Sequence, residues 1–311
     1  MLTIQQNTSR QAHELSGFFR FKADWVGQGD VDSWQHGLEG DVVELAVPGS
    51  WNEQRRELYE FHGEGWYERL IFIPDSWRGQ RIWIRIGSTA GNARVWLDGK
   101  LLGEHIGPHL PFEFELTDAV LFGQTQRLTI AVDNTLRHYD LPPGQARSDE
   151  QRALGHSSGK PDVAYDFFPF GGIHRPVTLY TTGPCKLQAL KIETNFEGSV
   201  GQLYVAAVID GANCGEIEFT IGEQTISCSA KSGHVEGELQ IKNVRLWSPE
   251  DPHLYSLEVV VRSVDGLVLD RYSQPVGVRT VRIEGNQLLL NGNPIFLRGV
   301  GKHEDFPIIG K

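Results

Sequence analysis

Apolar and polar residues alternate with a period of two in many short segments of the chain. In residues 81–87, for example, Ile82, Ile84 and Ile86 fall on one face. Successive side chains of a strand point to opposite faces, so this period predicts half-buried β-strands. Similar patterns predict strands at residues 93–100, 127–134, 176–182, 203–209, 254–264 and 287–292.

Turn signals separate these segments, and helix signals are scarce. Asp98-Gly99 is a two-residue hairpin signal. Clusters of turn-forming residues stand at 48–50 and 142–144. Many short strands with evenly spaced turns predict antiparallel sandwiches or barrels rather than βαβ units. The expected fold class is therefore mainly β.

The texture of the strands changes near Gly183. Seven of the eight tryptophans lie in residues 1–96, and the segments after Gly183 are poorer in aromatic residues. Residues 183–278 suit a seven-strand immunoglobulin-like sandwich. Residues 1–182 are too many for that fold and suit a larger jelly-roll.

The final segment, residues 279–311, has a third texture. A tight Asn291-Gly292 turn separates two strand-like stretches, and the second, residues 294–300, is apolar and ends on glycines. It then opens into three titratable side chains, as the C-terminal end of a barrel strand does: His303, Glu304 and Asp305. An apolar strand without neighbours is an exposed edge, so we expect this segment to be poorly ordered or loosely docked on the second sandwich.

The charge and hydrophobicity of the chain limit the classes of binding partner. The 311 residues carry a formal net charge of −11 and no basic run, which argues against nucleic-acid binding. No apolar run approaches the roughly 20 residues of a membrane helix, and the N-terminus lacks the apolar core of a signal peptide. No membrane partner is expected, and a cytoplasmic location is the prediction, with removal of an upstream signal as the alternative.

The cysteines Cys185, Cys214 and Cys228 form no CxxC motif. An odd number of scattered thiols favours a reducing compartment over a disulfide scaffold. A single bridge, such as Cys214 to Cys228, is the alternative.

The first candidate site is the segment YDFFPFGGIHRP, residues 165–176. Aromatic rings can stack on the apolar face of a sugar, and the Asp166 carboxylate can accept hydroxyl hydrogen bonds. The alternative is a loop that anchors one sandwich onto its neighbour. We favour that packing role for the aromatic residues and for the His-Arg pair, namely Phe167, Phe168, Phe170, His174 and Arg175.

The second candidate is RGVGKHED, residues 298–305. Its histidine has no partner at metal-ligand spacing, so no metal site is predicted. The glycines indicate close backbone approach or unusual φ. No phosphate-binding loop or GxSxG motif is present, and no cofactor is predicted. Glu53 stands in an early loop without a second carboxylate at a suitable spacing, so we expect it at the surface or an interface.

Several motifs resemble glycoside hydrolase family 2. They are VPGSWNEQ (47–54), GWYER (65–69), FIPDSWRGQRIWIRIGS (72–88), VWLDGKLLGEHIGPHLPFEFELTD (95–118), DFFPFGGIHRPVTLYTT (166–182), LWSPEDPHLYSLEV (246–259) and FLRGVGKHEDFPIIGK (296–311). They follow the family's order along nearly the whole chain. Within the family they are most similar to the β-glucuronidase branch.

The resemblance implies a jelly-roll sugar-binding domain (1–182), an immunoglobulin-like domain (183–278) and the first strand of a (β/α)8 barrel (279–311). It implies retaining hydrolysis of a β-glycoside by two glutamates, which lie on later barrel strands without counterparts here. Asp166 and His303 match family positions that reach the sugar. The implied partner is a carbohydrate, and the parent protein is expected to be a homo-oligomer.

Three hypotheses remain from the sequence. The first is a β-glucuronidase whose residues 1–311 are inactive alone; the others are a β-galactosidase-type enzyme and a non-catalytic carbohydrate-binding or scaffold module. The chain has HEDFPIIGK (303–311) where β-glucuronidases often have HEDADxRGKG. This departure leaves the choice of sugar open.

Overall fold

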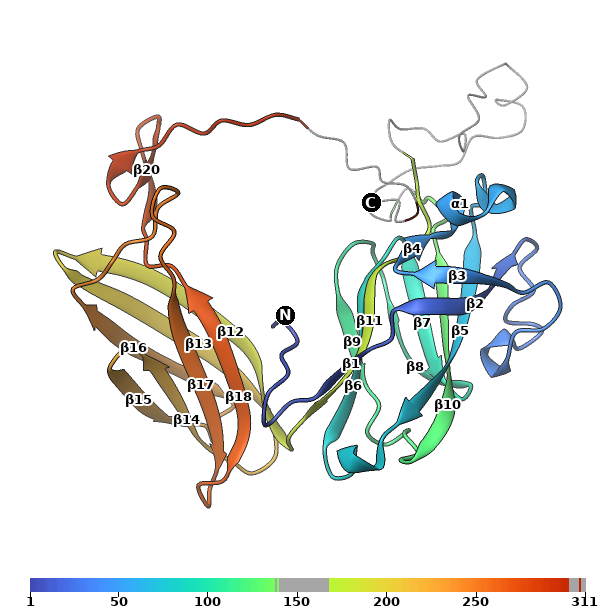
Figure 1. The fold of residues 1–311 in the computed structure, drawn as a ribbon, viewed down its shortest axis with the longest axis horizontal. Coiled ribbons are helices and arrows are strands. Elements are labelled where there is room, and N and C mark those ends of the chain that lie inside the picture. Colours follow the sequence, from blue (N-terminus) through green and yellow to red (C-terminus); the bar gives the residue numbers. More distant parts are fainter. Residues whose placement is uncertain (138, 140–167, 302–307, 309–311) are drawn as a thin grey trace. The chain divides into compact units, whose positions relative to one another are not determined.

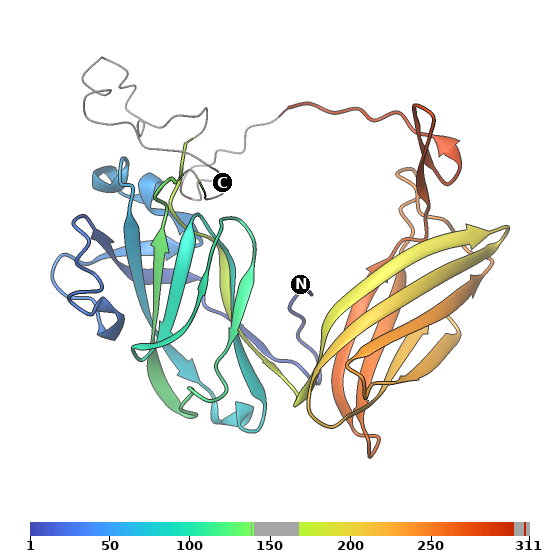
Figure 2. The ribbon, with the colours of Figure 1, turned by 180° about the vertical axis from the view of Figure 1, so that it is seen from behind.

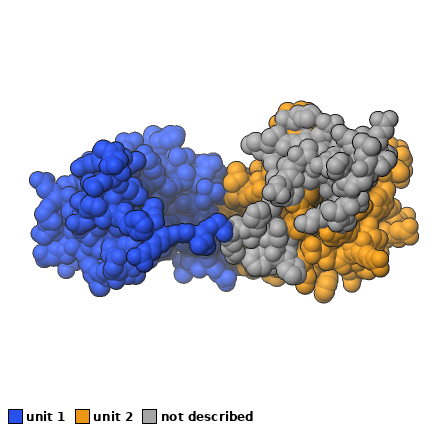
Figure 3. Space-filling model, turned by 90° about the horizontal axis from the view of Figure 1, so that it is seen from above, with its two compact units in different colours: residues 1–11, 181–302 blue, residues 12–180, 303–311 orange. Residues whose placement is uncertain are grey.

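The computed structural model describes residues 1–137, 139, 168–301 and 308. They form two compact units, which are coloured separately in Figure 3. One unit is built on residues 12–180 and contains what we call the first sandwich. The other combines residues 1–11 with 181–302 and contains the second sandwich. All sheets of the described residues are antiparallel, which confirms the predicted mainly β fold class.

The first sandwich has two sheets (Figure 1). The order of one is β1-β11-β6-β9, with β4 beside β11: β1 (Ala12–Glu14), β4 (Gly49–Ser50), β6 (Arg81–Thr89), β9 (Phe112–Glu115) and β11 (Gly172–Thr182). The order of the other is β3-β2-β5-β10-β7-β8: β2 (Gly17–Asp24), β3 (Val43–Val47), β5 (Glu64–Ile73), β7 (Asn92–Leu97), β8 (Lys100–His105) and β10 (Gln124–Asp133). This two-sheet arrangement is that of a jelly-roll.

Alternation along the strands forms the core of this sandwich. Ile82, Ile84 and Ile86 are fully buried between the sheets, as the sequence pattern predicted, and Phe21 and Tyr67 join them from the opposite sheet. Each such side chain contributes about 1.5–3 kcal/mol relative to an exposed one. The helical elements of the described residues are single turns: η1 (Trp34–His36), α1 (Trp51–Gln54), η2 (Arg56–Leu58) and η3 (Asp75–Trp77).

The second sandwich has seven strands in sheets of three and four (Figure 2). The smaller sheet has the order β12-β13-β16: β12 (Cys185–Glu197), β13 (Val200–Gly211) and β16 (His234–Lys242). The larger has the order β15-β14-β17-β18: β14 (Cys214–Ile221), β15 (Gln224–Ser229), β17 (Tyr255–Ser263) and β18 (Val268–Val276). Seven antiparallel strands divided in this way match the immunoglobulin-like sandwich that was predicted.

The N-terminal segment packs on the second sandwich. Residues 1–11 belong to that unit by their contacts, although the sequence prediction grouped them with residues 12–182. The Gln5 side chain bonds the backbone of Ser273 in both directions. Arg10 makes a bidentate ion pair with Asp270 at 2.6 and 2.7 Å, and both side chains are almost fully buried. These long-range contacts left no local pattern in the sequence.

A disulfide joins Cys185 to Cys214, with Cα atoms 5.8 Å apart. The pairing considered from the sequence, Cys214 to Cys228, is therefore wrong, and Cys228 is free. Cys185 begins β12 and Cys214 begins β14, so the bond links the two sheets of the second sandwich. Cys228 lies on β15 instead, opposite Ile217 of β14.

A third, small sheet follows: β19 (Val281–Glu284), β20 (Gln287–Leu290) and β21 (Asn293–Pro294). Asn291 and Gly292 both have positive φ, which confirms the tight turn. The Asn291 side chain donates to the Trp247 carbonyl and accepts from the Thr280 amide, which docks the hairpin. Residues 281–294 thus form a hairpin that contacts the second sandwich, and the predicted looseness of this docking stays a prediction.

The strand expected over residues 294–300 is not formed beyond Pro294. Phe296, Leu297 and Val300 are mostly exposed. A strand needs a hydrogen-bonded neighbour, and beyond the Ile295 amide, which donates to the Leu288 carbonyl, no strand pairs with residues 296–300 in the described part of the chain. In the part of the chain that the structure describes, no helix is long and apolar enough to cross a bilayer.

Candidate carbohydrate site

The two residues predicted to contact sugar lie outside the described residues. Asp166 and His303 are among those whose positions are not described, as are Glu304 and Asp305. The described part of the first motif begins at Phe168 and leads into β11. The site can therefore be built only from the scaffold that holds this end of the motif.

Asn134 ties the two flanks of the 138–167 segment together. It follows β10, and its side chain donates to the Pro169 carbonyl at 3.0 Å while accepting from the Gly63 amide at 3.0 Å. Asn134 is buried, so these bonds replace water at polar atoms that would otherwise be unsatisfied. The two chain ends that border the segment are thus fixed to each other and to the start of β5.

Asn52 is the centre of the scaffold. It lies on α1 and is 2 % exposed. Its amide nitrogen contacts the carbonyls of Leu58, Tyr59 and Phe61 at 2.9, 3.1 and 3.2 Å. Its amide oxygen accepts from the Gly171 amide at 2.7 Å. One side chain therefore joins the loop after α1 to the DFFPFGG motif, a role that the sequence reasoning missed.

The paired glycines of the motif are required by close packing. A Cβ on Gly171 would stand 1.9 Å from the Trp51 ring. Gly172 has φ +132°, and its Cβ would meet the Gly49 carbonyl at 2.5 Å. Gly171 also accepts a hydrogen bond from the Trp51 amide at 3.1 Å. A side chain at residue 171 would push the motif away from α1, and one at residue 172 would push it away from β4.

The two described phenylalanines of the motif are buried, which agrees with the packing role favoured for them. Phe168 and Phe170 are 6 and 8 % exposed. Their ring centroids lie 4.4 Å apart, and Phe168 also packs on Tyr59 at 5.3 Å. Phe167 lies outside the described residues. Neither described ring presents a free face for stacking on a sugar.

The other candidates divide between core and surface. His174 is buried on β11, with its ring 6.4 Å from that of His109, whereas Arg175 is exposed. The interface role proposed for this pair stays a prediction. Glu53 is exposed on α1, which confirms its expected surface position. In the second motif, a Cβ placed on Gly299 or Gly301 would meet no heavy atom within 4 Å. Close packing against the described residues therefore does not require glycine at these two positions.

Two carboxylates face each other beside the motif. Glu64 and Asp133 are cross-strand partners on β5 and β10. Arg94 pairs with Glu64 at 2.6 Å, and Arg137 pairs with Asp133. Burial raises the pKa of Glu64, against the opposing effect of Arg94. Because each carboxylate is held by an arginine, we assign them to ion pairs rather than to catalysis.

No group of three or more potential metal-ligating side chains is found within the described ranges. The scaffold thus supplies a rigid platform of tryptophan, asparagine and glycine at one end of the first sandwich. Its geometry fixes where the segment carrying Asp166 rejoins the fold.

Comparison with known proteins assigns the family. Residues 12–183 match "Glycosyl hydrolases family 2, sugar binding domain", and residues 186–279 match "Glycosyl hydrolases family 2". The chain belongs to glycosyl hydrolase family 2. The two family 2 segments meet between residues 183 and 186, close to the boundary between the two compact units.

Curated relatives within family 2 are similar along the whole chain. The β-glucuronidase of Paenibacillus borealis is 35 % identical over 100 % of this chain and 52 % of its own length. The human β-glucuronidase is 34 % identical, again over 100 % of this chain and 51 % of its own length. The chain spans about half the length of these relatives.

Solved structures agree. The β-glucuronidase from Ruminococcus gnavus in complex with D-glucuronic acid has a TM-score of 0.88 at 29 % identity, covering 99 % of this chain and 52 % of that one. A β-glucuronidase from an uncultured Clostridium species gives 0.85 at 31 % identity, covering 100 % and 52 %. The arrangement of strands in this chain is therefore that of the corresponding half of solved β-glucuronidases.

Proposed function

We propose that the protein containing these residues is a retaining β-glucuronidase, and that residues 1–311 supply two of its sugar contacts, Asp166 and His303. The observation that carries the proposal is similarity to β-glucuronidases over the whole chain, in sequence and in fold. The scaffold supports the first contact, because Asn52, Trp51 and the paired glycines hold the described end of the same motif at residues 171–172.

The chain by itself is proposed to be inactive. Retaining hydrolysis needs one carboxyl group as acid/base and another as nucleophile, about 5–5.5 Å apart. Glu64 and Asp133, the facing carboxylates beside the motif, are in ion pairs with arginines. From the family resemblance we expect both catalytic glutamates on later barrel strands. Asp166 and His303 are proposed to bind the sugar, without an acid/base to protonate its leaving oxygen or a nucleophile to capture its anomeric carbon.

The test has two parts. In the full-length protein, chromogenic β-glucuronide should be hydrolysed in preference to the matching β-galactoside. Asp166→Ala and His303→Ala should each lower kcat/KM for the glucuronide by about 10- to 100-fold, the effect of losing a charge-assisted hydrogen bond. Asp118→Ala, at an exposed position of the first sandwich, is the matched control and should leave kcat/KM unchanged.

The second part uses residues 1–311 alone. Neither chromogenic substrate should be turned over. Turnover of either one that is abolished by Asp166→Ala would overturn the proposed inactivity. A full-length protein that prefers the β-galactoside would instead favour the other family 2 activity, and one that cleaves neither would favour a binding or scaffold module.

A further inference from the structure

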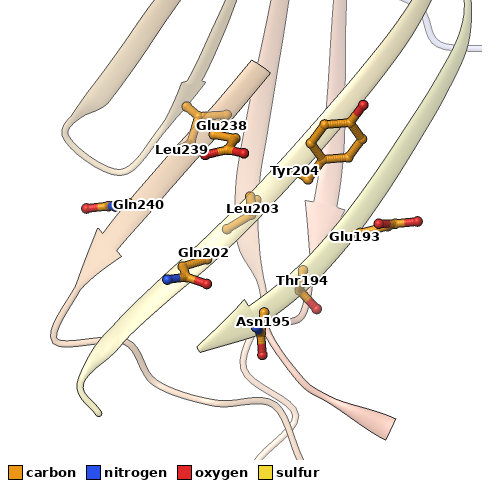
Figure 4. A pocket seen from close by; sticks show the side chains of 9 residues that line it. All are labelled: Glu193, Thr194, Asn195, Gln202, Leu203, Tyr204, Glu238, Leu239 and Gln240. Carbon is orange, nitrogen blue, oxygen red and sulfur yellow. The ribbon is translucent and has the colours of Figure 1, made fainter. Parts of the chain in front are cut away.

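The outer face of sheet β12-β13-β16 carries an ordered grid of polar side chains. In one row, Glu193, Tyr204 and Glu238 are direct cross-strand partners. In the next row, Asn195, Gln202 and Gln240 are partners in the same way. Figure 4 shows the middle strand carrying Gln202 and Tyr204 between the two flanking strands. Together these six residues, which we call the β13 grid, line a trough of about 300 Å³.

The amide row is available for a ligand. Within the described part of the chain, the side-chain amides of Asn195, Gln202 and Gln240 have no hydrogen-bond partner, although Gln240 uses its backbone amide to bond Gln224. Each amide offers one acceptor and two donors. Adjacent amides at strand spacing can therefore bond adjacent hydroxyl groups, which also both donate and accept.

Tyr204 supplies the apolar element of the trough. It lies at the centre of the first row and is partly exposed. An aromatic ring with a polar tip suits a surface that is half apolar and half hydrated, as the face of a sugar ring is. Glu236 lies on the same face and raises the pKa of the Tyr204 hydroxyl, so this tyrosine stays neutral with its polar tip beside a carboxylate.

The charges of the face select against anions. Glu193, Glu236 and Glu238 are all exposed on it, and the neighbouring cation, Lys191, is already paired with Glu193 at 2.6 Å. Apart from Lys242 at the end of β16, a uronate or sulfated sugar would face only carboxylates and neutral amides on this face. A neutral saccharide would instead find carboxylate and amide acceptors for its hydroxyls.

We propose that the β13 grid is an accessory binding site for a neutral saccharide. The occupant stacks one sugar face on Tyr204 and hydrogen-bonds its hydroxyls to the amide row and to the carboxylates. The trough volume is at the lower end of the roughly 300–1,000 Å³ typical of small-molecule sites, which suits a short stretch of sugar. This site is independent of the uronide contacts proposed for Asp166 and His303.

The experiment is isothermal titration of the 311-residue chain with neutral cello-, xylo-, manno- and galacto-oligosaccharides. Oligogalacturonate serves as the anionic comparison. We expect at least one neutral series to bind and oligogalacturonate not to bind. Tyr204→Ala should weaken binding about tenfold or more through the lost ring contact. Gln202→Ala should weaken it also, whereas Tyr204→Phe should retain most of the affinity.

Tyr139→Ala is the matched control, because this tyrosine is highly exposed in the other unit. Far-ultraviolet circular dichroism of each variant establishes that the sheet is intact. Three results would overturn the site: no neutral saccharide binds at millimolar concentration, oligogalacturonate binds as well as neutral sugars do, or a folded Tyr204→Ala variant binds with unchanged affinity. The last result would place binding elsewhere on the chain.

Discussion

Replacing Asn52 by alanine tests whether this one side chain joins the Asp166 motif to the first sandwich. The substitution removes the acceptor of the buried Gly171 amide and the donor to the Tyr59 carbonyl. The carbonyls of Leu58 and Phe61 keep other partners, the Phe61 amide and the Trp51 indole. The cost is therefore concentrated in these two groups, with a smaller share from the Ser50 hydroxyl, which donates to the Asn52 amide oxygen at 3.4 Å.

The magnitude follows from those two groups. Leaving a buried donor or acceptor unsatisfied costs about 1–3 kcal/mol each. The Gly171 amide is buried, and the Tyr59 carbonyl is partly buried and can recover some hydration. We expect the free energy of unfolding of the first sandwich to fall by about 2–4 kcal/mol. Asn52→Asp should cost at least as much, since it keeps the acceptor but places a carboxylate against three carbonyl oxygens.

Tryptophan fluorescence during urea unfolding isolates this effect. Seven of the eight tryptophans lie in residues 1–96, and Trp247 alone belongs to the other unit. With a urea m-value of about 2 kcal/mol/M, the midpoint of the fluorescence transition should fall by about 1–2 M. Glu53→Ala, at the exposed neighbour on α1, should stay within about 0.5 kcal/mol of the parent. A fluorescence midpoint that Asn52→Ala leaves unmoved would refute the assignment.

Three further predictions concern buried charge, the disulfide and pH. Asp270→Asn should destabilise the second sandwich by about 3–5 kcal/mol, measured by circular dichroism, because it removes the carboxylate charge that forms the bidentate pair with the buried Arg10 guanidinium; a loss below about 1 kcal/mol would contradict this. Reduction of Cys185–Cys214, which are 29 residues apart, should cost the same sandwich about 3–4 kcal/mol, with the tryptophan transition unmoved. Burial lowers the pKa of His105, so the unfolded chain binds its proton first as pH falls below about 6.5. Stability of the first sandwich should then decline with acidification, and the His105→Gln variant should show a smaller decline over that window.

The features predicted from sequence are those with a local cause. Alternation predicted the burial of Ile82, Ile84 and Ile86, because a strand has two faces whatever its partners are. Asp98-Gly99 and Asn291-Gly292 both adopt the positive φ pairs of tight hairpins, because asparagine, aspartate and glycine tolerate that region. In the second sandwich the same alternation predicted the strands at residues 203–209 and 254–264, which lie in β13 and β17, whereas the number of seven strands was inferred from the length of the segment.

The features that were missed depend on which segments meet in space. The Cys185–Cys214 bond crosses between sheets, and the sequence offers no way to choose it over Cys214–Cys228. Residues 294–300 have a strand-like composition, but composition cannot supply a pairing neighbour.

The motif at residues 165–176 was found from the sequence, whereas Asn52, which holds it, was not. Asp166 and the paired glycines stand together in one segment of twelve residues, so their chemistry can be inferred from adjacency. Asn52 lies 119 positions before its partner Gly171. In its turn, the neighbouring carboxylate of Glu53 was the residue considered for catalysis. Asparagine can bond donors and acceptors at once, and only a buried site that contains both makes full use of it. Position 171 requires glycine because the ring of Trp51, the residue beside Asn52, occupies the space that a side chain at position 171 would need. The two local patterns, WNEQ and PFGG, are therefore halves of one structural unit.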